Sequence, residues 1–139
     1  MTKRTTLLAL IALAFSATAL MYAEDRMRAG LWEVSTTVDG KASGVTGGSC
    51  YTPAMVEMAN SPAKTLRENT EKSLTSRHCT LKEFKMEGNS ISMSSVCGAR
   101  SSVTSSTYTV DAFETTSTST TAGVSTVAHM KGRRMGDCK

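Results

Sequence analysis

The segment Cys79-Thr-Leu-Lys-Glu-Phe-Lys-Met-Glu-Gly-Asn-Ser-Ile-Ser-Met-Ser-Ser-Val-Cys97 sets the fold class that we expect. It holds two runs of alternating residues around Gly88-Asn89, a pair that tolerates the positive φ of tight hairpin turns. With this pair as the loop, Phe84, Met86, Ile91 and Met93 share one face, and the other face is mostly polar apart from Leu81 and Val96. One buried and one solvated face is typical of an antiparallel sheet over a single core.

The four cysteines of the chain, Cys50, Cys79, Cys97 and Cys138, predict two disulfides, because an even number in a short exported chain is typical of a disulfide framework. A zinc or redox site is not supported, because no Cys-x-x-Cys pair is present. In the hairpin register Lys82 faces Ser95 and Cys97 faces Thr80, so Cys79 and Cys97 point to opposite faces. A bridge between those two would need a register slip or a bulge.

Two pairings remain: Cys50–Cys79 with Cys97–Cys138, or Cys50–Cys97 with Cys79–Cys138. We favour the first, because it holds the segment between Cys50 and Cys79 at both ends and ties the last strand to the hairpin.

The beginning of the chain has the pattern of a secretory signal peptide over residues 1–23. Lys3 and Arg4 precede an apolar run that ends in small residues, which allows cleavage after Ala19 or Ala23. The run is shorter than the roughly 20 apolar residues of a transmembrane helix. We therefore expect a periplasmic or secreted chain without a transmembrane segment after signal removal.

Residues 24–139 are expected to form one β-rich domain. The residues from Met27 to Val38 alternate as a first strand, with Trp32 as a core residue. The pairs Thr52-Pro53 and Ser61-Pro62 begin two short helices, because Thr and Ser cap helices and proline suits the first helical position.

The stretch from residue 101 to residue 126 contains 16 serines and threonines among its 26 residues. Threonine is β-branched and suits strands, so we predict strands with solvated faces here, separated by turns at Asp111-Ala112 and Ala122-Gly123. The expected fold is mainly β: one curved antiparallel up-and-down sheet or half-barrel with a short helical insertion and two disulfides.

The order and spacing of these features resemble domain of unknown function family 3617 over residues 26 to 138. The residues that carry the resemblance are Gly30-Leu31-Trp32-Glu33, Cys50 before Thr52-Pro53, Cys79 with Phe84 and Gly88-Asn89, Cys97-Gly98, and Gly132-Arg-Arg-Met-Gly-Asp-Cys138. The resemblance implies a small exported protein of a Gram-negative bacterium. It implies no catalytic residues, because the family has no established activity.

Charge and motifs argue against several function classes. The net charge of +4 falls to +2 once Lys3 and Arg4 leave with the signal peptide, which is too weak a field to indicate nucleic-acid binding. We predict no enzyme, since neither His78 nor His129 lies in a catalytic motif and no Gly-x-Ser-x-Gly elbow is present. We also predict no cofactor and no metal site.

The preferred function is a non-catalytic binding module for a hydrophobic small molecule, a lipid or a peptide. Its groove would be lined by the expected inward-facing residues: Trp32, Val34, Phe84, Met86, Ile91 and Met93. The alternative is a structural or interaction protein of the cell envelope. A copper protein is a weaker hypothesis, based on Met55-x-x-Met58 and His129-Met130, since thioether and imidazole ligands suit copper(I).

Overall fold

The computed structural model of the chain describes residues 25–139, except the side chains of residues 45–47. The predicted signal peptide lies outside the described residues. The elements follow in the order β1 (Gly30–Val38), β2 (Lys41–Tyr51), α1 (Pro53–Asn60), α2 (Ala63–Thr75), β3 (Cys79–Glu87), β4 (Ser90–Cys97), β5 (Arg100–Thr109), β6 (Ala112–Thr121) and β7 (Val124–Gly136).

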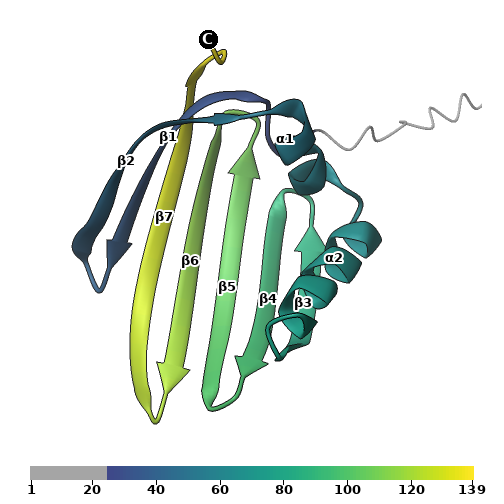
Figure 1. Ribbon diagram of the computed structural model, residues 1–139, viewed down its shortest axis with the longest axis vertical. Helices are drawn as coiled ribbons and strands as arrows, with labels where there is room; N and C mark the ends of the chain where they lie inside the picture. The colour runs from purple at the N-terminus through teal and green to yellow at the C-terminus, as the bar shows by residue number, and fades with distance from the viewer. Residues whose placement is uncertain (1–24) are drawn as a thin grey trace, which may run out of the picture.

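The seven strands form one antiparallel sheet in the order β2-β1-β7-β6-β5-β4-β3. From β3 to β7 each strand pairs with the next one in the chain, and β1 then pairs with β7. The sheet curls without closing, because β2 and β3 are its two edges (Figure 1). The predicted fold, a curved antiparallel sheet or half-barrel with a short helical insertion, is therefore confirmed.

The two helices occupy the connection between β2 and β3. Thr52 is the N-cap of α1, as predicted, and its side chain accepts a hydrogen bond from the backbone of Met55. Helix α1 lies over one end of the sheet and α2 runs along β3 (Figure 1). We call the end under α1, where the Val110-Asp111 turn joins β5 to β6, the capped end. The opposite end, with the Ala122-Gly123 turn, is the open end. Within the described residues, neither helix is long and apolar enough to cross a bilayer.

The core is small and lies at the capped end. Trp32 is completely buried and packs against Phe113, with ring centroids 5.8 Å apart, and against Tyr51 at 6.0 Å. Val34 and Val56 complete the contact between the sheet and α1. Such aromatic contacts concentrate apolar burial in a few residues near α1.

Two disulfides join Cys50 to Cys138 and Cys79 to Cys97. The predicted disulfide framework is confirmed for all four cysteines, but both favoured pairings, Cys50–Cys79 and Cys97–Cys138, are wrong. The error lies in the hairpin register. The expected pairs hold from Glu87–Ser90 to Glu83–Ser94, but the register then shifts so that Leu81, and not Lys82, faces Ser95.

Lys82 is the extra residue of a β-bulge in β3. The bulge moves Cys79 directly opposite Cys97, with their Cα atoms 4.3 Å apart. Residues that face each other in an antiparallel pair share a face, so the bulge permits the bridge that the regular register forbids. Disulfides of this kind are typical of proteins that fold in an oxidising compartment outside the cytoplasm.

Candidate ligand-binding site

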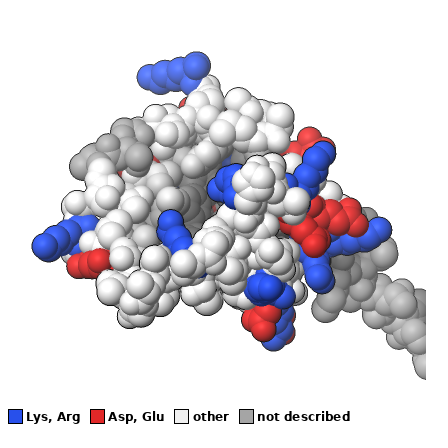
Figure 2. All heavy atoms as spheres, turned by 60° about the horizontal axis from the view of Figure 1, so that its bottom comes forward, with Lys and Arg blue, Asp and Glu red and all other residues white. Residues whose placement is uncertain are grey.

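One face of the sheet is hollow along its length. Strand pairing places on it the even-numbered residues of β1, β5 and β7 and the odd-numbered residues of β4 and β6, and we call it the concave face. Figure 2 shows the hollow from the open end, with basic side chains bordering its mouth. Two adjoining cavities occupy this face, one at each end.

The cavity at the capped end is mainly apolar and has a volume of about 290 Å³. It lies between α1 and strands β5, β6 and β7. Its lining residues are Met27, Tyr51, Met55, Val56, Tyr108, Phe113, Thr115 and Met130. Three of them are methionines, whose flexible side chains adapt to irregular apolar ligands. Met55 and Met130 remain 53% and 39% exposed, so the cavity has apolar surface still available to a ligand.

The cavity at the open end is larger, about 490 Å³, and four of its eight lining residues carry a hydroxyl. Its lining residues are Val38, Arg100, Ser117, Ser119, Thr121, Val124, Thr126 and Ala128. These side chains are short apart from that of Arg100, and none of them is aromatic, which explains the empty volume.

A row of hydroxyl pairs connects the two cavities across β5 and β6. The oxygens of Ser106 and Thr115 are 2.9 Å apart, and those of Thr104 and Ser117 and of Ser102 and Ser119 are each 3.0 Å apart. The row ends at the open end, where Arg100 Nη2 donates to Ser119 Oγ at 2.8 Å. Along β5 and β6, the side chains of the concave face therefore change from the aromatic rings of Tyr108 and Phe113 to a row of hydroxyls that ends at Arg100.

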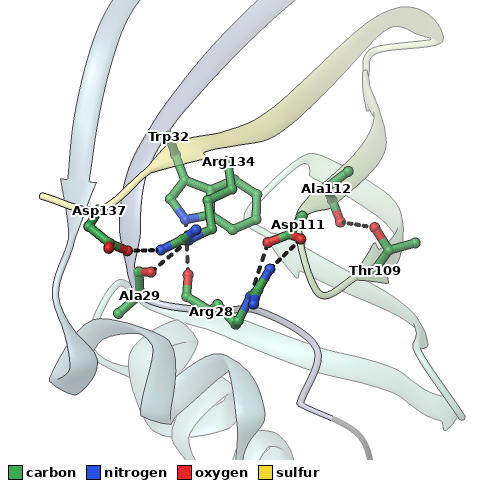
Figure 3. Close-up of polar contacts among 8 residues, drawn as sticks. All are labelled: Arg28, Ala29, Trp32, Thr109, Asp111, Ala112, Arg134 and Asp137. Atoms are coloured by element: carbon green, nitrogen blue, oxygen red, sulfur yellow. Dashed lines mark hydrogen bonds and ion pairs between the residues drawn. The ribbon is translucent and has the colours of Figure 1, made fainter.

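The chain before β1 fixes the edge of the capped cavity. Trp32 Nε1 donates to the Arg28 carbonyl oxygen at 3.0 Å, and Arg134 Nε donates to the Ala29 carbonyl oxygen at 2.8 Å (Figure 3). The Arg28 guanidinium also binds the Asp111 carboxylate, with nitrogen–oxygen distances of 3.1 and 2.5 Å. That ion pair is about half exposed, and exposed ion pairs contribute little to stability. The hydrogen bonds from Trp32 and Arg134 to the backbone carbonyls therefore hold the segment more effectively than the ion pair does.

Helix α1 is attached to the same segment. Arg26, only 5% exposed, donates to the carbonyl oxygens of Ala59 at 2.7 Å and Ser61 at 2.5 Å. Asn60 binds the backbone of Met27 twice: its Oδ1 accepts from Met27 N at 3.0 Å, and its Nδ2 donates to Met27 O at 2.8 Å. These contacts satisfy carbonyls at the end of the helix and hold α1 over the cavity.

Asn60→Ala should lower the free energy of unfolding by about 1–3 kcal/mol, because it leaves the backbone groups of Met27 without their partner. We expect the loss of stability to be greatest in α1, so the backbone amides of α1 should exchange hydrogen faster than those of β5 and β6. Asn69→Ala on α2 is the matched control, since its amide donates only to the Met58 sulfur. Equal effects of the two substitutions on α1 exchange would contradict this role of Asn60.

The predicted groove residues lie on the concave face as expected, but not where the cavities are. Trp32 and Val34 are buried in the core. The other four, Phe84, Met86, Ile91 and Met93, are half-buried near the β3 edge, and none of the six lines either concave-face cavity. Phe84 and Met93 instead border a separate hollow with Glu83, Lys85, Ser92, Ser94 and Val103.

The residues of the capped cavity were missed because most of them meet only through non-local strand pairing. The one local signal is the turn between β5 and β6. It lies at Val110-Asp111, one residue before the predicted Asp111-Ala112, and it places Tyr108 directly opposite Phe113. The methionine clusters considered for copper are separated. Met55 lines the capped cavity and Met58 contacts Asn69, while His129 bonds Thr116 on the convex face and Met130 lies on the concave face. Among residues 25–139 there is no group of three or more His, Cys, Asp and Glu that could hold a metal ion.

Comparison with protein families identifies the family of the chain. A family model described as a protein of unknown function, DUF3617, matches residues 27–138. The chain belongs to the DUF3617 family. This confirms the resemblance inferred from the spacing of cysteines, turns and glycines. Comparison of this DUF3617 chain with curated proteins and with solved structures gave no significant match.

Proposed function

We propose that this DUF3617 domain is a non-catalytic module of the periplasm that binds an elongated amphipathic small molecule, such as a single-chain lipid, on its concave face. The observation that carries the proposal is the apolar cavity beneath α1, which lies on the same face as a second cavity lined by Arg100 and several hydroxyls. Small-molecule sites are usually preformed, mainly apolar and supplied with a few polar groups.

The dimensions support this proposal. The concave residues of β6 run from Phe113 in the capped cavity to Thr121 in the open one. At about 3.3 Å per residue this path is about 26 Å long. One leaflet of a bilayer accommodates an acyl chain in about half of the 30 Å hydrocarbon thickness. A single-chain lipid therefore fits with its apolar end beneath α1 and its polar end among the hydroxyls.

Titration calorimetry with two single-chain probes, laurate and glycerol monolaurate, tests this function. We expect saturable binding of one molecule for at least one probe. Met55→Trp should weaken that binding about tenfold or more, because the larger side chain fills the capped cavity. Met58→Trp is the matched control, since Met58 lies on the same helix but lines a different hollow, between α1 and α2.

Two outcomes would contradict the proposal: failure of both probes to bind the unaltered protein, or equal binding by the Met55→Trp and Met58→Trp variants. The first would favour the alternative role as an interaction protein of the cell envelope. Circular dichroism of each variant excludes a loss of fold as the cause of lost binding.

A further inference from the structure

The charges of the sheet are divided between its faces. All glutamates of the described strands occupy convex positions: Glu33, Glu83, Glu87 and Glu114. Neither concave-face cavity has an acidic residue in its lining. The acid nearest along the chain to the open cavity is Asp39, beside Val38, and its carboxylate accepts a hydrogen bond from the backbone of Val127 at 2.8 Å.

Basic residues stand at the open end of the same face. Arg100 lines the open cavity, and among residues 25–139 it takes part in none of the ion pairs. Lys41 lies opposite Val38 in the pairing of β1 with β2, and so occupies a position beside the same cavity. Of the residues that the structure describes, Arg100 is therefore the one charged residue in the lining of this cavity, and its charge is positive.

The hydroxyl row adds hydrogen-bond donors to this charge. Two paired hydroxyls carry two hydrogens but use only one in the bond between them. Each of the pairs Ser102–Ser119 and Thr104–Ser117 thus keeps one hydrogen for an acceptor in the cavity. Arg100 uses one of its five N–H groups on Ser119, so most of its donors are also available. An oxygen-bearing anion satisfies these donors and the charge together.

We infer that the ligand of the concave face is an anionic amphiphile, bound with its acidic headgroup at Arg100 and its apolar chain directed to the cavity beneath α1. This inference rests on the proposed function and specifies the chemical class of its ligand. The guanidinium and the hydroxyls of Ser117 and Ser119 form the headgroup site. The matching class is a single-chain carboxylate, since its head is compact and accepts several hydrogen bonds.

The test compares laurate with glycerol monolaurate, which share one acyl chain and differ in the charge of the head. We expect laurate to bind the unaltered protein about tenfold more tightly. Arg100→Gln should remove this preference: the affinity for laurate should fall about tenfold, and the affinity for glycerol monolaurate should stay nearly unchanged. Arg100→Lys should retain part of the preference, because it keeps the charge but not the planar fork of donors. Raising the salt concentration should weaken the binding of laurate more than that of glycerol monolaurate.

Arg133→Gln is the matched control, because it makes the same charge change at an exposed convex position of β7. The inference is overturned if both probes bind with equal affinity, or if Arg100→Gln and Arg133→Gln reduce laurate binding to the same extent. In either case the binding function itself would stand. Failure of both probes to bind the unaltered protein would overturn the binding function and this inference together.

Discussion

Removal of the Cys50–Cys138 bridge should lower the free energy of unfolding by about 4.6 kcal/mol, against about 3 kcal/mol for the Cys79–Cys97 bridge. In the chain-entropy description a cross-link stabilises by restricting the unfolded chain, and its effect grows with the loop that it closes. The two bridges close loops of 88 and 18 residues. Domains of this size are stable by only about 5–15 kcal/mol, so loss of the longer bridge removes a large part of the total.

Urea unfolding of the double variants Cys50→Ala/Cys138→Ala and Cys79→Ala/Cys97→Ala measures the two effects. The fluorescence of Trp32 reports the transition, because it is the only tryptophan and is fully buried. Non-reducing peptide mapping of the unaltered protein is the companion measurement. A peptide linking Cys50 to Cys79 would refute the pairing, and a greater loss for the shorter bridge would refute the entropic ranking.

The disulfide pairing depends on a bulge that the alternation of residues does not reveal. Alternation and the Gly88-Asn89 loop correctly predicted the hairpin, and Gly88 does take a positive φ of 56°. The bulge at Lys82 has no such local signal, because a charged residue in an exposed strand fits either register. Its presence depends on a contact that alternation cannot reveal, the bridge of Cys79 to Cys97.

The concave face was predictable, but the location of its cavities was not. The alternation of Trp32 and Val34 and of the hairpin residues identifies a common face, and strand pairing places all of them on it. The cavities depend on which strands lie side by side and on where small side chains coincide. The chain after Arg100 consists largely of serine and threonine on both faces of its strands. Composition alone therefore does not distinguish the hydroxyls of the hollow from those in solvent.

Gly132→Val should lower the free energy of unfolding by about 1–3 kcal/mol or more, because it forces Phe113 out of the core. Gly132 lies opposite Phe113 in the pairing of β6 with β7, and the ring lies directly on the glycine. A Cβ at this position would be 2.1 Å from the ring carbon Cε1 of Phe113. The ring has little room to move, since it packs on Trp32 and on Tyr108, whose centroid is 6.2 Å away.

Ala128→Val is the matched control, because Ala128 is on the concave face of the same strand but lines the open cavity. The substitution adds apolar bulk where space exists, so it should change the free energy of unfolding, measured with urea, by no more than about 0.5 kcal/mol. Gly132→Val should also change the near-ultraviolet signal of the aromatic cluster and weaken probe binding at the capped end, since Phe113 lines that cavity. Equal stability of the two variants would mean that the Phe113 ring can leave Gly132 without cost. The capped cavity would then be an adaptable surface formed around each ligand and not a preformed site.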